Sequence, residues 1–115
     1  MPAVTNPHLK NNERSLWLHR AVLLKLLANR TGVTATARAN LMSSRPLNPS
    51  SGPYFDAWEE LLSGDLVSLV EALVSSDERF IALRQTSPFF GILSDDERKV
   101  VLDGFEAYWR SNYAD

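Results

Sequence analysis

The chain of 115 residues contains no cysteine, and this absence removes several kinds of site at once. Without thiolates there is no disulfide framework, no cysteine-ligated metal and no thiol nucleophile. Long apolar runs are missing as well, because charged residues such as Arg20, Lys25 and Glu71 interrupt them well before the about 18 residues that a membrane-spanning helix needs. The sequence therefore predicts a cytoplasmic protein that makes no contact with a membrane.

Acidic residues are almost absent from the first part of the chain. Residues 1–52 carry seven Lys and Arg but only one acid, a net charge of +6, whereas residues 53–115 carry five cations and thirteen acids, a net charge of -8. Such asymmetry indicates either a partner of opposite charge for one half or two halves that neutralise each other on folding. The sequence leaves both interpretations open.

Period-two alternation is also missing, and apolar residues recur instead at helical spacing. We predict an all-α, compact single domain of five to six short helices. The expected helices cover residues 13–29, 33–42 and 53–63, a segment after Asp65, a segment from Glu78 towards Pro88, and residues 95–112. Ser75 with Glu78, and Ser94 with Glu97, have the spacing of capping boxes at two of these helix starts.

The domain boundaries follow from proline and serine content. Residues 1–11 are predicted to be a flexible N-terminal arm, and residues 12–115 a single helical domain of a size that buries about two-thirds of its surface. Residues 43–52 are rich in proline and serine, so we expect there a loop that separates the basic half from the acidic half.

No group of residues has the pattern of a catalytic or metal site. His8 and His19 are eleven residues apart, and we expect His19 to be a partly buried hydrogen-bonding residue. The acids at 59–60 and 95–97 are explained by a solvent-facing surface and by a helix N-terminus. We therefore predict no catalytic residues, no metal and no cofactor, and the chain is not expected to be an enzyme.

One basic segment resembles a helix-turn-helix unit. In residues 27–41, LANRTGVTATARANL, an alanine precedes a turn glycine by four residues and a polar helix follows. The second helix would offer a DNA groove the side chains of Thr34, Thr36, Arg38 and Asn40, and Arg30, just before that helix, is a further candidate for DNA binding. The alternative is an ordinary pair of packed helices.

Two aromatic residues, Phe89 and Phe90, lie in a segment bounded by Pro88 and Gly91. They either plug the core between the last two helices or present an anchor to a partner. The first helix is apolar around nearly its whole circumference, so it needs partners on more than one side.

Several blocks together resemble a known family. The blocks are RSLWLHRAV at 14–22, the segment around Tyr54 and Trp58, LRQTSPF at 83–89 and the Ser94–Arg98 region. Over residues 12–105 the chain is similar to small uncharacterised bacterial helical proteins associated with toxin–antitoxin-like gene pairs. It departs from that family at residues 31–36, where the family has a plain charged helix.

These observations favour a non-catalytic binding protein, the antitoxin-like member of a bacterial two-gene module that neutralises its partner by direct contact. The alternative function is a helix-turn-helix transcriptional regulator that binds DNA. The expected protein partner is a basic, toxin-like protein or a second copy of the chain in a homodimer. The candidate partner-binding residues are Trp17, Tyr54, Phe55, Trp58, Glu59, Phe89 and Phe90.

Overall fold

The structure, a computed structural model, describes residues 7–113, which form six α-helices. These are α1 (Pro7–Ala28), α2 (Arg30–Ser44), α3 (Gly52–Ser63), α4 (Leu66–Val74), α5 (Glu78–Arg84) and α6 (Asp95–Tyr113). No strand occurs within residues 7–113, and the prediction of an all-α, compact single domain is confirmed. None of the described helices is long and apolar enough to cross a membrane.

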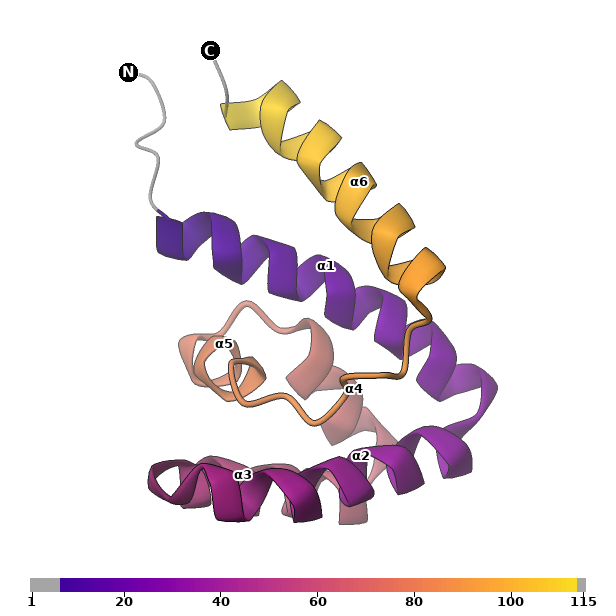
Figure 1. The fold of residues 1–115 in the computed structure, drawn as a ribbon, viewed down its shortest axis with the longest axis vertical. Coiled ribbons are helices and arrows are strands. Elements are labelled where there is room, and N and C mark those ends of the chain that lie inside the picture. The colour runs from indigo at the N-terminus through magenta and orange to yellow at the C-terminus, as the bar shows by residue number, and fades with distance from the viewer. Residues whose placement is uncertain (1–6, 114–115) are drawn as a thin grey trace.

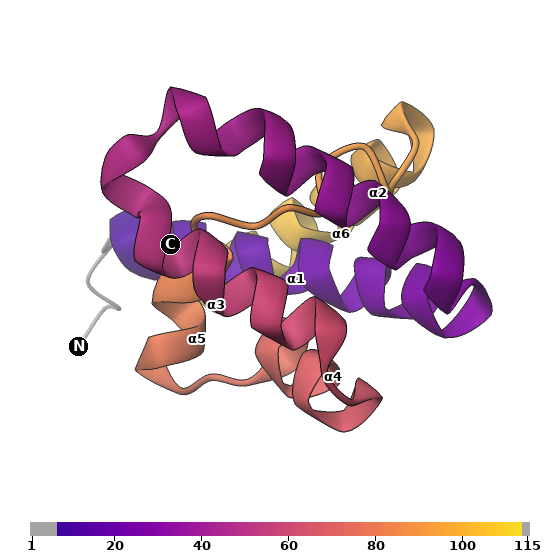
Figure 2. The same ribbon diagram turned by 90° about the horizontal axis from the view of Figure 1, so that it is seen from below.

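Helix α1 runs through the middle of the molecule. It lies between α6 on one side and α2 to α5 on the other, as Figures 1 and 2 show from two directions. This position explains why its apolar residues surround the helix: Leu16, Val22 and Leu26 are buried on its packed sides.

The core lies between α1 and the layer formed by α2, α3 and α4. Its largest fully buried side chains include Trp58, Leu26, Leu69 and Leu73. The Trp58 indole is 0% exposed, and its Nε1 donates a hydrogen bond to the Leu83 carbonyl oxygen at 3.0 Å. Helix α3 is thereby joined to α5 by both packing and a hydrogen bond.

Helix α6 is attached to α1 by an aromatic cluster. The Trp17 ring packs against Phe105 and Tyr108, with ring centroids 5.7 and 5.2 Å apart. The two helices run antiparallel, since Lys25 near the end of α1 pairs with Glu97 at the start of α6, and Lys10 pairs with Glu106. Gly104 faces Trp17, and a Cβ there would stand 3.6 Å from the ring, in ordinary contact.

The start of α1 differs from the prediction. Residues 7–11 of the expected flexible arm form the first turns of α1, and residues 1–6 lie outside the described part of the chain. Proline suits the first helical position, and the Lys10 ion pair with Glu106 holds this turn against α6. Asn11 and Asn12 therefore lie within α1.

The second helix is longer than predicted because Asn29 caps it. The Asn29 side-chain oxygen accepts a hydrogen bond from the Gly32 backbone N–H at 3.0 Å, so α2 already begins at Arg30. A Cβ on Gly32 would collide with this Asn29 side chain. The expected turn over Thr31 and Gly32 is thus the first turn of α2.

One of the two predicted capping boxes is confirmed. Ser94 N–H donates to Glu97 Oε1 at 2.8 Å, and Glu97 N–H donates to Ser94 Oγ at 3.1 Å. The prediction for Ser75 and Glu78 is wrong, since Asp77 caps α5 by accepting a hydrogen bond from Arg79 N–H. An aspartate at this position competes directly for the first free N–H groups of the helix.

The loop predicted at residues 43–52 contains two short 3-10 turns, Arg45–Leu47 and Pro49–Ser51, which bring α3 back beside α2. Here the two oppositely charged halves meet. Arg45 donates to Asp56 and to Glu59, both at 2.7 Å, and Lys10 and Lys25 likewise pair with acids of the second half. Charge neutralisation between the halves is therefore part of the fold.

The connection from α5 to α6 passes α1 and places the neighbouring residues Phe89 and Phe90 in different surroundings. Phe89 is buried, with its ring 5.4 Å from that of Trp58, whereas Phe90 is 56% exposed.

His19 on α1 is buried next to this connection. Its Nδ1 donates to the Ser15 carbonyl oxygen at 2.7 Å, and its Nε2 accepts from the Ser87 hydroxyl at 2.7 Å. The prediction of a hydrogen-bonded core histidine is confirmed.

Candidate functional site

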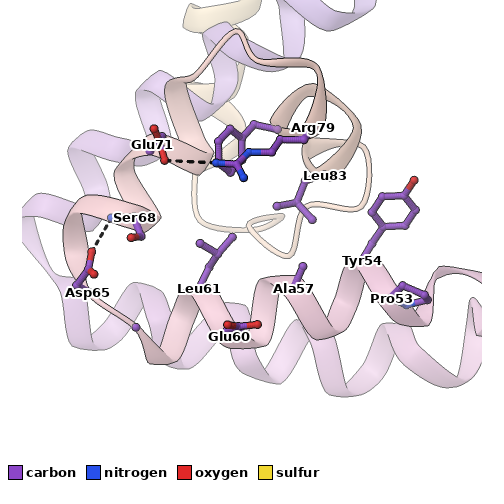
Figure 3. A pocket seen from close by; sticks show the side chains of 12 residues that line it. Pro53, Tyr54, Ala57, Glu60, Leu61, Asp65, Ser68, Glu71, Arg79 and Leu83 are labelled. Atoms are coloured by element: carbon purple, nitrogen blue, oxygen red, sulfur yellow. Dashed lines mark hydrogen bonds and ion pairs between the residues drawn. The ribbon is translucent and has the colours of Figure 1, made fainter.

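A groove with a volume of about 790 Å³ lies between α3, α4 and α5 (Figure 3). We call it the acidic groove. Its lining residues are Pro53, Tyr54, Ala57, Glu60, Leu61, Gly64, Asp65, Ser68, Glu71, Arg79, Phe80 and Leu83. The residues from α3 recur at three- and four-residue spacing, so one face of that helix forms a whole wall.

The acidic groove has an apolar floor and a charged rim. Ala57, Leu61 and Leu83 extend into it from α3 and α5, as Figure 3 shows. Its charged lining residues are three acids, Glu60, Asp65 and Glu71, and one cation, Arg79. The local charge is therefore negative.

The rim charges differ in how far they are already paired. Arg79 lies 3.9 Å from Glu71 and also stacks over the Phe80 ring. Asp65 accepts the Ser68 backbone N–H at 2.7 Å, which lowers the pKa of this carboxyl and keeps it ionised. Glu60 has no ion pair or side-chain hydrogen bond within residues 7–113, so its charge is available to a partner.

The predicted partner-binding residues fall into two groups. Phe55, Trp58 and Phe89 are buried in the core and Trp17 is half-buried against α6. The exposed members are Tyr54, at 44% and in the acidic groove, together with Phe90 and Glu59. Glu59 is already paired with Arg45, and Phe90 lies on a different surface.

Sequence reasoning missed the residues that α4 and α5 contribute to the groove. Glu71 was noted only as a charge that interrupts an apolar run, and Arg79 had no signal at all. When short helices are connected by turns, the sequence does not show which of their faces will line the same hollow. Glu60 was noted as part of an acidic pair and Asp65 as the residue before a helix, and the structure brings both to this rim.

The segment that resembles a helix-turn-helix unit packs against α3. Thr34 is buried and its hydroxyl donates to the Arg30 carbonyl oxygen. Arg30 and Arg38 donate to carbonyl oxygens at the end of α3, at 3.3 and 3.0 Å. Asn40 donates to the Pro88 and Phe90 carbonyl oxygens, and Thr36 is exposed. DNA recognition by these residues stays a prediction.

The outer surface of α1 retains large apolar side chains. Leu24 is 70% and Leu27 is 59% exposed, beyond the area that α2, α4 and α6 cover. Single exposed leucines are common on monomeric proteins, so this surface alone does not identify a partner.

Ser87 and His19 have the spacing of a nucleophile and its base, but their surroundings disfavour that chemistry. Burial, and to a smaller degree the nearby Arg84, lower the pKa of His19 to about 4, which makes it a weak base at neutral pH. The Ser87 hydroxyl also accepts the Phe89 backbone N–H. The pair joins α1 to the α5–α6 connection. Within residues 7–113 no group of His, Asp and Glu has the arrangement of a metal site.

Neither a protein-family model, nor a curated protein, nor a solved structure matches this chain. The geometry of the acidic groove is therefore the main basis for a functional proposal.

Proposed function

We propose that this chain is a non-catalytic binding protein, the antitoxin-like member of a bacterial two-gene module, that neutralises a basic partner by holding one of its segments in the acidic groove. The single observation that carries the proposal is the apolar floor bordered by Glu60, Asp65 and Glu71. An amphipathic helix that places its apolar side chains on the floor and its lysines or arginines at the rim fits this arrangement.

Each part of the groove contributes differently to such binding. Burial of apolar surface between the partner and Ala57, Leu61 and Leu83 supplies most of the affinity. The carboxylates mainly accelerate the encounter with a cationic partner and fix its orientation. Glu60 is the most informative of them, because no cation of residues 7–113 neutralises it.

A photo-crosslinking experiment tests the location of the partner. A benzoylphenylalanine replaces Tyr54 in one variant and Met42, which is exposed on α2, in the other. We expect a basic protein of the source cells to crosslink at position 54 and not at position 42. Equal crosslinking at both positions, or a crosslink only to a second copy of the chain, contradicts the proposal.

Charge reversal then tests the contribution of the rim. We expect Glu60→Lys to lower the association rate with the crosslinked partner by about tenfold and to abolish rescue of growth when that partner is toxic alone. Asp103→Lys is the matched control, because Asp103 is an exposed acid on α6 outside the groove. If both variants behave like the unmodified chain, the acidic rim is not the binding surface.

A further inference from the structure

Arg84 is a buried cation without a carboxylate partner. It lies in the last turn of α5 and is 4% exposed. Its Nη1 donates to the Ala72 carbonyl oxygen at 2.9 Å and its Nη2 to the Ser75 carbonyl oxygen at 2.7 Å, which closes the end of α4. No acid of residues 7–113 forms an ion pair with it, and burial lowers its pKa.

This arginine lines a second, smaller hollow formed by residues of the first turns of α1 and of α5. Figures 1 and 2 show that the start of α1 and helix α5 lie at the same end of the molecule. We call it the Arg84 hollow, and its volume is about 330 Å³. The lining residues are His8, Asn11, Asn12, Ser15, Ile81, Arg84 and Gln85. All four residues from α1 lie on one helix face, and no acid is among the seven.

One N–H of the Arg84 guanidinium has no hydrogen-bond partner among residues 7–113. Neither of the two hydrogen bonds of Arg84 uses its Nε. Among the described residues no polar side-chain atom is both sealed from solvent and without a hydrogen-bond partner. The Nε–H is therefore not sealed from solvent, and Arg84 lines the hollow. In a guanidinium the Nε–H and one Nη–H lie along the same edge, and this two-donor edge is the part that we expect a ligand in the hollow to meet.

Amide and hydroxyl groups make up much of the remaining lining. The Asn11 side-chain oxygen accepts a hydrogen bond from Arg14 at 2.7 Å, which leaves its amide N–H₂ as a donor. Asn12, Ser15 and Gln85 add further amide and hydroxyl groups, and Ile81 adds an apolar surface. The hollow thus combines one fixed cation with several hydrogen-bond donors.

We propose that the Arg84 hollow binds the carboxylate group of a small organic acid. The planar two-oxygen end of a carboxylate matches the two-donor edge of the guanidinium, and the pairing neutralises a charge that is otherwise buried alone. A phosphate dianion matches less well, because no lysine and no second arginine lines the hollow. The site is separate from the acidic groove and does not depend on the function proposed there.

Titration of the labelled full chain with sodium acetate, followed by NMR, tests this inference. We expect saturable shifts of the Arg84 Nε–H and of the Asn12 and Gln85 side-chain amides. Sodium chloride at equal ionic strength is expected to leave these signals in place. Saturable binding of inorganic phosphate that is tighter than that of acetate overturns the assignment to carboxylates, and the absence of a saturable acetate shift overturns the site.

Three variants locate the binding. Arg84→Lys keeps the charge but loses the two-donor edge, and we expect acetate affinity to fall at least about tenfold. Asn12→Leu fills the hollow without touching the hydrogen bonds of Arg84, and it is expected to abolish the shifts even if the lysine variant unfolds. Arg45→Lys is the matched control, because Arg45 is already paired with two carboxylates. Unchanged acetate binding in Asn12→Leu contradicts the proposal.

Discussion

Arg79 and Arg84 lie on the same short helix, α5, yet their surroundings are opposite. Arg79 is exposed at the acidic groove, where it approaches Glu71, whereas Arg84 is buried beside α1 and bonds only to backbone carbonyl oxygens. Their positions around the helix explain the difference. Residues 79, 80 and 83 line the acidic groove, whereas residues 81, 84 and 85 line the Arg84 hollow. One helix of seven residues thus separates an acidic surface from a cationic one.

His19 on α1, whose pKa is lowered by burial and by the charge of Arg84, and Asp65 at the acidic groove should differ first in their response to acid. The pKa of His19 is about 4 in the folded chain against 6.5 for an unperturbed histidine, so between these values the unfolded state binds more protons. We expect stability to be fully present above pH 6.5 and to fall by about 3 kcal/mol as the pH drops towards 4. Asp65, at the groove, has a lowered pKa and responds only below its ordinary range near 3.8.

Urea denaturation of the chain and of His19→Gln between pH 7 and 4 measures this loss. The variant should show a much flatter dependence in that window, and the His19 ring signals should titrate near pH 4. A His19 midpoint near 6.5 would show that the ring is not held neutral by burial.

The next largest effect concerns the two arginines themselves. Arg84→Met leaves the Ala72 and Ser75 carbonyl oxygens at the end of α4 without their donor, and we expect a loss of about 2 kcal/mol in the free energy of unfolding. Arg79→Met removes an exposed pair and should change stability by no more than about 0.5 kcal/mol. If Arg84→Met and Arg79→Met lower the thermal stability equally, the two arginines do not differ in the way that their surroundings indicate.

Trp58→Phe tests how the groove side is held. The ring volume is largely kept, but the hydrogen bond to Leu83 that joins α3 to α5 is lost. We expect a destabilisation of about 1 kcal/mol in urea denaturation. Partner crosslinking from position 54 should also weaken, because the spacing between the two walls is no longer fixed. A variant with unchanged stability would show that packing alone sets this spacing.

The smallest effect is expected for the arginines of α2. Arg38 donates to the Leu62 carbonyl oxygen beside the acidic groove, so Arg38→Ala should lower stability by about 0.5 kcal/mol. If this segment also reads DNA, Arg38→Ala and Arg30→Ala should weaken duplex binding and reduce its salt dependence. Absence of duplex binding at low salt would remove the regulator hypothesis.

Local signals in the sequence predicted much of the fold. Helical spacing identified all six helices, and the Ser94 and Glu97 pattern identified one helix start because the two partners are only three residues apart in the chain. Which of two neighbouring polar residues caps a helix was harder to predict. At the start of α5 the N-cap is Asp77 and not Ser75. Asn29 similarly extended α2 by capping it earlier than the glycine suggested.

The sites were less predictable because they depend on which helix faces meet. Tyr54, Glu60 and Asp65 were noted from the sequence, but Glu71 and Arg79 reach the same groove only through the turns between α3, α4 and α5. Arg84 carries no local sign of burial, since its acceptors lie twelve and nine residues earlier in the chain. Aromatic residues such as Phe55 and Trp58 were candidates for partner binding because they are large and apolar. The same property places them in the core.

The most direct test of the separation made by α5 is an NMR titration of the labelled chain with two ligands of opposite charge. A short helical peptide of leucines and lysines should shift the backbone amides of Ala57, Leu61 and Leu83, whereas sodium acetate should shift those of Asn12 and Gln85. The two sets should not overlap. If both ligands shift the same residues, or if the peptide acts on α6 or the outer face of α1, the assignment of opposite charges to the two sides of α5 is contradicted.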